Sequence, residues 1–230
     1  MFDFTYILFV ALPSMLIAGA ASLLVKSAFH RYSQVGSMRG YSGAEAAQML
    51  LDHAGITDVS IVPAHGFLSD HYNPLTKELA LSEEVFHSRS VAAIGVATHE
   101  AGHAIQHAHN YLPLWARSAL VPMASIGSSL GMAVMFFGLL MSKVVVLIGV
   151  LLFSGVLLFQ IVTLPVEFNA SSRAKRLVVE AGIVYPEERH GIDAVLNAAA
   201  LTYVAAVINS LLVVLYYLFR AGLLGGHRDD

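Results

Sequence analysis

Two histidines and a glutamate stand close together in the middle of the chain. His99, Glu100 and His103 form the pattern H-E-x-x-H within residues 98–109. On a helix, side chains four residues apart share one face, with Cβ atoms about 5–6 Å apart, so both imidazoles can bind one metal ion. Zinc accepts neutral imidazole nitrogens, and a catalytic zinc keeps three protein ligands and one open position. Glu100 lies beside that position, where a carboxylate can take the proton of an activated water.

The residues around this pattern decide whether it is a chance match in an ordinary buried helix. They are small and apolar: Ala92, Ala93, Ile94, Val96, Ala97, Ala101 and Ala104. A helix made of such residues is buried, and buried ionisable side chains need partners. We therefore expect a metal site here.

A third protein ligand is needed, and the sequence offers two candidates. His109 completes the ligand spacing of metzincins, but those proteins have a chain-reversing glycine where this chain has Gln106. Without that turn the helix continues, and His109 lies about 9 Å further along its axis than His103. Glu167 is favoured, because it follows Pro165 at the expected start of a helix beside an apolar segment. The alternative is a glutamate that only stabilises this helix start through the helix dipole.

The composition is that of a membrane protein. Of 230 residues, 57% are hydrophobic and 13% are charged, against about 45–50% and about 25% in soluble domains. A net charge of −3 with no basic stripe indicates no nucleic-acid partner. The absence of cysteine excludes disulfides and thiolate ligands, and it fits a reducing compartment.

Apolar segments divide the chain, since about 20 apolar residues suffice to cross a bilayer. The expected organisation is a transmembrane anchor at 1–25, a zincin-like domain at 26–118, a transmembrane hairpin at 119–164, a second catalytic part at 165–200, a transmembrane helix at 201–224 and a tail at 225–230. The first segment could instead be a cleaved signal peptide ending near Ala18-Gly-Ala20. Lys26 and Arg31 follow the apolar run rather than precede it, which favours an anchor.

Local signals predict the elements that position the motif. Ser42 and Glu45 form a capping box at the start of a helix, and Ser90 is the N-cap expected for the metal-binding helix. Short apolar runs at 59–62 and 79–81 predict strands of a small sheet. Within the hairpin, Gly127-Ser-Ser-Leu-Gly131 is a small-xxx-small pattern that suits close helix packing, although a glycine-tolerant membrane helix would show the same residues.

Several stretches resemble the YugP-like neutral zinc metallopeptidase family. They are T-H-E-A-G-H-A-I-Q-H at 98–107, P-V-E-F-N-A-S-S-R-A at 165–174, V-L-N-A-A-A-L-T-Y-V-A-A at 195–206 and S-D-H-Y-N-P at 69–74. The chain is more distantly similar to HtpX-like membrane peptidases. With the composition, the resemblance implies a mainly α integral membrane protein with about four transmembrane helices and a zincin-like α+β metallopeptidase domain carrying a small β-sheet. It implies a gluzincin site with one Zn²⁺ ion, His99, His103 and Glu167 as ligands and Glu100 as general base.

The remaining site candidates are less specific. In HtpX-like enzymes the third ligand is the glutamate of E-x-x-A-D, and four residues after Glu167 this chain has Ser171 in place of the aspartate. A serine would raise ligand basicity less. Tyr203, His190 and Arg173 are candidate donors to an oxyanion, each with a structural role as the alternative. An edge strand near 70–74 is the expected place for an extended substrate. A second metal site is the less favoured interpretation of four scattered histidines: His65, His71, His107 and His109.

Three functions fit these residues. The leading one is a membrane-embedded zinc metalloendopeptidase that cleaves membrane or membrane-proximal polypeptides. The second is a catalytically weak zinc-binding membrane scaffold for a partner complex, and the third is a zinc hydrolase of other substrates. Glu100 favours an enzyme, because a structural metal site has no use for a base. The expected partners are a polypeptide substrate and the lipid bilayer, while oligomeric or accessory-protein partners stay open.

The distribution of positive residues predicts the orientation. With four spans, the two polar blocks share one side of the membrane, and they carry Lys26, Arg31, Arg39, Lys77, Arg89, Arg117, Arg173, Lys175, Arg176 and Arg189. The other side carries only Lys143, Arg220 and Arg228. Because positive residues near membrane ends stay in the cytoplasm, we expect a multi-pass protein of the cell (inner) membrane whose catalytic site faces the cytoplasm.

Overall fold

The computed structural model describes residues 4–66 and 69–224, so the predicted tail at 225–230 lies outside the described residues. Most of the described chain is helical, and four helices are long and apolar enough to cross a membrane: Phe4–Ser33, Leu112–Met141, Lys143–Glu180 and Pro186–Arg220. The prediction of a mainly α membrane protein with a small sheet is therefore confirmed.

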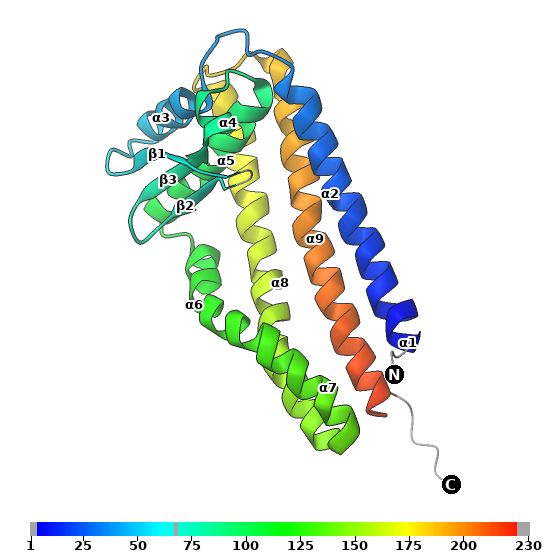
Figure 1. The fold of residues 1–230 in the computed structure, drawn as a ribbon. Helices are drawn as coiled ribbons and strands as arrows, with labels where there is room; N and C mark the ends of the chain where they lie inside the picture. Colours follow the sequence, from blue (N-terminus) through cyan, green and yellow to red (C-terminus); the bar gives the residue numbers. More distant parts are fainter. Residues whose placement is uncertain (1–3, 67–68, 225–230) are drawn as a thin grey trace. The chain divides into compact units, whose positions relative to one another are not determined.

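Figure 1 shows the elements in chain order. They are α1 (Phe4–Tyr6), the π-helix η1 (Ile7–Ala11), α2 (Leu12–Ser33), α3 (Gly43–His53), β1 (Ser60–Ala64), β2 (His71–Asn73), β3 (Glu78–Ser82), α4 (Glu83–His87), α5 (Val91–Ala108), α6 (Leu112–Ile126), the π-helix η2 (Gly127–Gly131), α7 (Met132–Met141), α8 (Lys143–Glu180), the 3₁₀ turn η3 (Pro186–Glu188) and α9 (Arg189–Arg220).

The chain forms two compact units. The first, which we call the span unit, contains Met1–Ala21, Trp115–Leu164 and Thr202–Asp230. The second, the site unit, contains Ser22–Leu114 and Pro165–Leu201. The site unit thus combines the first polar block with the helix ends that flank the apolar parts of α8 and α9.

Glycines bring the helices of the span unit together. Ser142 alone separates α7 from α8, as expected for a tight hairpin. A Cβ atom added at Gly131 would lie 2.8 Å from the backbone nitrogen of Phe153 on α8, and one at Gly138 would lie 2.7 Å from that of Val146. Added at Gly127, it would overlap the carbonyl oxygen of Leu152. The small-xxx-small pattern therefore marks close helix packing, in which only glycine fits.

A three-stranded sheet in the site unit follows the predicted strands. Its order is β1-β3-β2, with β1 parallel to β3 in the register Ser60↔Glu78 and β2 antiparallel to β3 in the register Asn73↔Glu78. β3 is central and largely buried, because its apolar residues face helices. β2 lies at an edge, within the segment 70–74 where the sequence predicts an edge strand.

The helix that carries the histidines begins where the sequence predicts. The hydroxyl of Ser90 accepts a hydrogen bond from the N–H of Ala93, which caps α5. The capping box of Ser42 and Glu45 on α3 is present as well. α5 is buried along most of its length, and Ile94 and Ile105 belong to the apolar core of the site unit. This burial makes α5 a rigid platform for the site.

α8 corrects the expectation that a new helix starts at Pro165. The helix runs without interruption from Lys143 to Glu180, with Pro165 inside it. Proline removes one backbone hydrogen bond of the helix and normally breaks or kinks it. Here the turns beyond Pro165 are held by packing, because Val166, Ala170 and Ala174 are fully buried. Glu167 consequently lies in the interior of a helix, not in its first turn, so a helix-start role for this carboxylate is excluded.

Candidate metal centre

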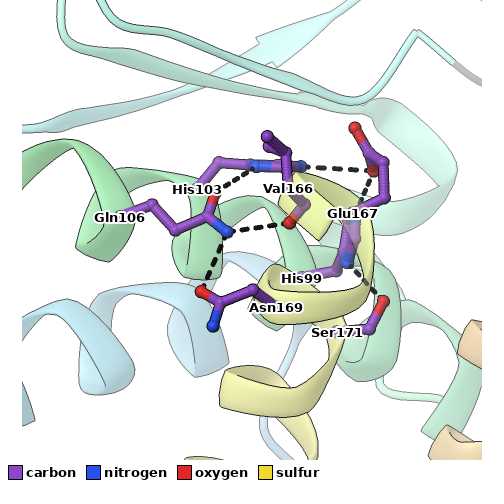
Figure 2. A network of polar contacts seen from close by, with 7 residues as sticks. All are labelled: His99, His103, Gln106, Val166, Glu167, Asn169 and Ser171. Carbon is purple, nitrogen blue, oxygen red and sulfur yellow. Dashed lines mark hydrogen bonds and ion pairs between the residues drawn. The ribbon is translucent and has the colours of Figure 1, made fainter. Parts of the chain in front are cut away.

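Three side chains from two helices converge in the site unit. His99 and His103 lie one turn apart on α5, and Glu167 comes from α8 (Figure 2). The Glu167 Oε2 atom lies 3.3 Å from Nε2 of His99 and 3.5 Å from Nε2 of His103. One nitrogen or oxygen atom from each residue lies within 4.8 Å of the other two. The group is protected from solvent, since Glu167 is 3% and His103 6% exposed.

The spacing of these atoms fits zinc. Donors bound at about 2.0–2.1 Å around a tetrahedral centre lie about 3.3–3.4 Å apart. The distances of 3.3 and 3.5 Å from the Glu167 oxygen to the two imidazole nitrogens are close to that value. Two imidazoles and one carboxylate are also a donor set that zinc uses in catalytic sites.

The other ring nitrogen of each histidine has its own partner. Nδ1 of His99 lies 3.1 Å from the hydroxyl of Ser171, and Nδ1 of His103 lies 3.0 Å from Oε1 of Gln106 (Figure 2). The amide oxygen of Gln106 can only accept, so His103 carries its proton on Nδ1. In the neutral ring the lone pair is then on Nε2, the nitrogen 3.5 Å from the carboxylate of Glu167, where a metal ion can use it. Such contacts behind the ligands fix the tautomer and the ring orientation.

Gln106 joins the two helices, a role that was not predicted from the sequence. Its amide nitrogen donates to the backbone oxygen of Val166 at 2.8 Å and to Oδ1 of Asn169 at 3.0 Å. Arg173 in turn donates to the same Oδ1 at 2.8 Å. Gln106 is fully buried, and a buried amide on an apolar helix is costly unless it is bonded. A buried glutamine three residues after His103 was the available signal.

A glycine permits the two helices to meet. A Cβ atom added at Gly102 would lie 2.7 Å from the carbonyl oxygen of Ala170 on α8. Real Cβ atoms do not approach a backbone oxygen so closely, so only glycine fits at this crossing. Glu167 and Ser171 flank Ala170 on the same helix. The glycine of the H-E-A-G-H stretch therefore sets the distance between the histidines and the carboxylate.

Glu100 is half-buried next to the triad on α5. Burial disfavours the charged form of the neighbouring His103, but its bond to Glu167 and the negative charges of Glu100 and Glu167 hold the pKa of His103 above its ordinary value. The metal-free site therefore attracts positive charge, which a divalent cation supplies in place of the proton.

The edge strand β2 is tied to the metal-binding helix. The hydroxyl of Tyr72 on β2 lies 2.8 Å from Nδ1 of His107 on α5. Burial, and then the charge of Asp58, raise the pKa of Tyr72 to about 12. The phenol is therefore neutral and can donate to the imidazole. This bond holds the edge strand against the helix that carries Glu100.

The other predicted residues are placed as follows. His109 follows the end of α5 at Ala108, is exposed, and contacts Arg173 at 3.4 Å. Arg173 reaches the polar network of the site through Asn169, to which it donates a hydrogen bond. His190 contacts the carbonyl of Glu187 and the ring of Tyr32, and Tyr203 belongs to the span unit.

His65, His71 and His107 each contact a different residue, Glu83, Ser69 and Tyr72. Across the described ranges, only His99, His103 and Glu167 form a group of three that could hold a metal ion.

Comparison with known proteins identifies the family of the chain. The profile of a family described as "Putative neutral zinc metallopeptidase" matches residues 6–222. The chain is 41% identical over 211 residues to a "Putative membrane protease YugP" of Bacillus subtilis (strain 168), a match that covers 91% of this chain and 94% of that protein. No solved structure matches. With a match over nearly its whole length, the chain belongs to this family of neutral zinc metallopeptidases.

Proposed function

We propose that the protein is a membrane-embedded zinc metalloendopeptidase of the gluzincin type that hydrolyses membrane or membrane-proximal polypeptides. The observation that supports this most directly is the triangle of His99, His103 and Glu167, with the half-buried carboxylate of Glu100 next to His99 in the sequence. In this proposal the triangle holds one Zn²⁺ ion. When bound, zinc supplies a Lewis acid that lowers the pKa of a coordinated water to about 7.

The residues of the chain supply the remaining chemistry. Glu100 accepts the proton of the attacking water on its carboxylate and passes it to the leaving amine. His103 is held in one tautomer by Gln106, and His99 is oriented by Ser171. Because Ser171 stands where related peptidases have an aspartate, it supports the imidazole without adding a second negative charge.

The sheet offers a place for the substrate backbone. β2 is an edge strand with an unpaired side, and an extended polypeptide can add to such an edge through main-chain hydrogen bonds. The bond between Tyr72 and His107 keeps this edge close to α5. Edge addition needs an extended segment, so the proposed substrates are unfolded or loosely structured near the membrane.

The proposal is tested by Glu100→Gln, which keeps the size and polarity of the side chain but removes the base. The purified variant should retain its zinc, while hydrolysis of an unstructured polypeptide should fall by about 10²- to 10⁴-fold. Glu187→Gln makes the same change at an exposed glutamate and should leave the zinc content and the rate of hydrolysis unchanged. Full turnover in Glu100→Gln would contradict the general-base role. Zinc-loaded wild type without any hydrolysis would instead favour the scaffold function.

We also propose that the site faces the cytoplasm, because the positive residues near the membrane ends concentrate in the polar blocks. Thr57 is exposed in the site unit, and the chain has no native cysteine. Thr57→Cys should resist a membrane-impermeant thiol reagent in intact cells and react after lysis. Labelling in intact cells would place the site on the outer side.

A further inference from the structure

A cavity of the site unit lies on the far side of Ser171 from the triad, between the C-terminal part of α8 and the N-terminal part of α9. Its volume is about 350 Å³. Every charged side chain that lines it is a cation: Lys175 and Arg176 on α8 and Arg189 on α9. Ser172 and Asn197 add a hydroxyl and an amide to the wall. Three positive charges around one small cavity repel one another, and an anion bound between them would reduce this repulsion.

Two acidic residues nearby, Glu180 and Asp193, balance part of this charge, and the charge of Asp193 acts on Lys175 as well. Arg176 pairs with Glu180 at 2.9 Å and Arg189 with Asp193 at 3.6 Å, and neither carboxylate residue lines the cavity. Both arginines are about half exposed, at 59% and 49% of their side chains, so these pairs contribute little and can reorganise. Lys175 is half-buried and donates to the amide oxygen of Asn197, not to a carboxylate.

The position along the helices identifies the source of an anion. The apolar stretch of α8 ends at Leu164 and that of α9 begins at Leu201, next to the cavity residue Ala200. Phe168 borders the cavity about 6 Å beyond Leu164 along the helix and is 48% exposed. Polar headgroups extend about 5–7 Å beyond the hydrocarbon core on each side of a bilayer. The cavity therefore begins at the level of lipid headgroups, where Phe168 is its apolar end, and it extends away from the membrane to Arg189, about 18 Å from Leu201 along α9. The side chain of Lys175 reaches back to Asn197, about 6 Å from Leu201, so its ammonium group is the cation nearest to the headgroups.

We propose that this cavity binds the phosphate of an anionic phospholipid. Arginine forms bidentate hydrogen bonds to phosphate, lysine adds a point charge, and basic pockets between membrane helices bind lipid headgroups. Phe168 is placed to contact the start of an acyl chain. Ser171 lines the cavity and also contacts His99, so the bound headgroup lies behind the metal centre, on the side of His99 that faces away from Glu167.

The purified full-length protein in mixed micelles tests this inference with a readout that does not depend on peptidase activity. The probes are phosphatidylglycerol, phosphatidylcholine and inorganic phosphate, and the readout is the lipid retained in native mass spectrometry together with the shift of Tm. Wild type should retain one phosphatidylglycerol in preference to phosphatidylcholine. The double variant Lys175→Gln with Arg189→Gln should weaken that binding about tenfold or more. The control double variant Lys26→Gln with Arg31→Gln removes the same charge from α2, outside the cavity. It should leave phosphatidylglycerol binding unchanged.

Ser172→Leu provides a second variant, because it fills the cavity from an exposed position and leaves all charges in place. It should weaken phosphatidylglycerol binding like the double variant, even if that variant folds poorly. If the cavity double variant and the α2 double variant lost phosphatidylglycerol binding equally, the proposal would be overturned, because the lipid would then be attracted by the overall positive surface charge. Displacement of phosphatidylglycerol by millimolar inorganic phosphate would overturn the lipid as the source and assign the site to a soluble phosphate.

Discussion

The span unit and the site unit both contain a glycine at which α8 meets another helix, yet the two contacts have different consequences. At Gly131, the close approach is to Phe153, which belongs with Met135 and Val146 to one cluster of buried apolar side chains. At Gly102, the approach brings together polar atoms that belong to separate helices: the histidines, Gln106 and Glu167. The same sequence device therefore gives stability in one unit and chemistry in the other.

This difference indicates how each unit should respond to substitution. Close packing of apolar helices depends on shape alone, and many side chains share the contact energy. The site unit depends on particular atoms, because each buried polar group in the network has a specific partner. Substitutions in the span unit should change stability and leave metal affinity unchanged, while those in the network should lower metal affinity as well.

The largest effect is expected at Glu167. Glu167→Ala removes one of three proposed ligands and should weaken zinc binding by more than about 100-fold, the upper range for loss of a residue that only supports a ligand. His109→Ala should change zinc affinity less than twofold, because His109 lies beyond the end of α5 and contacts Arg173. Competition with a zinc-binding dye measures both. The reverse ranking would assign the third ligand to His109.

Gln106 should come next. Gln106→Met keeps the volume of the side chain but removes the oxygen that orients His103 and the nitrogen that bonds Val166 and Asn169. Zinc affinity should fall about 10- to 100-fold. Gln48→Met, at an exposed position of α3, is the matched control and should have no effect. Unchanged affinity in Gln106→Met would mean that the histidine is oriented by the metal alone.

The two glycines test the comparison itself. Added Cβ atoms would lie 2.7 Å from Ala170 O at Gly102 and 2.8 Å from Phe153 N at Gly131, so the steric conflict is nearly equal. Overpacking of this kind costs about 1–3 kcal/mol. Gly102→Ala should lower zinc affinity about tenfold, whereas Gly131→Ala should lower Tm and leave zinc affinity unchanged. A loss of zinc affinity in Gly131→Ala would show that the two units are energetically coupled.

The features that could be predicted from the sequence are those that local rules control. The capping box of Ser42 and Glu45, the cap at Ser90 and the two longer strands are set by neighbouring residues. The convergence of Glu167 with the histidines was expected from its place beside an apolar segment. The close approach at Gly127 and Gly131 was one of two alternatives, and only the facing helix could decide between them.

The features that escaped prediction depend on residues distant in sequence. The partners of Gln106 on α8 are 60 and 63 positions away, so no local pattern could reveal its role. Pro165 is a helix breaker by local rules, but the buried residues after it hold α8 together. The same holds for the basic cavity, whose cations stand on two helices and gather only when the helices are side by side.

The separation of the triad along the chain also affects its biosynthesis. His99 and His103 are made before α6, α7 and the apolar part of α8, and Glu167 follows these segments. A nascent chain that has reached only the turn at Ser142 holds two imidazoles and a base but no carboxylate ligand. If His99, His103 and Glu167 are the ligands, as proposed, tight zinc binding is possible only after α7 and the apolar part of α8 have been synthesised. The proposed hydrolytic activity would then begin only after the α7–α8 hairpin has left the ribosome.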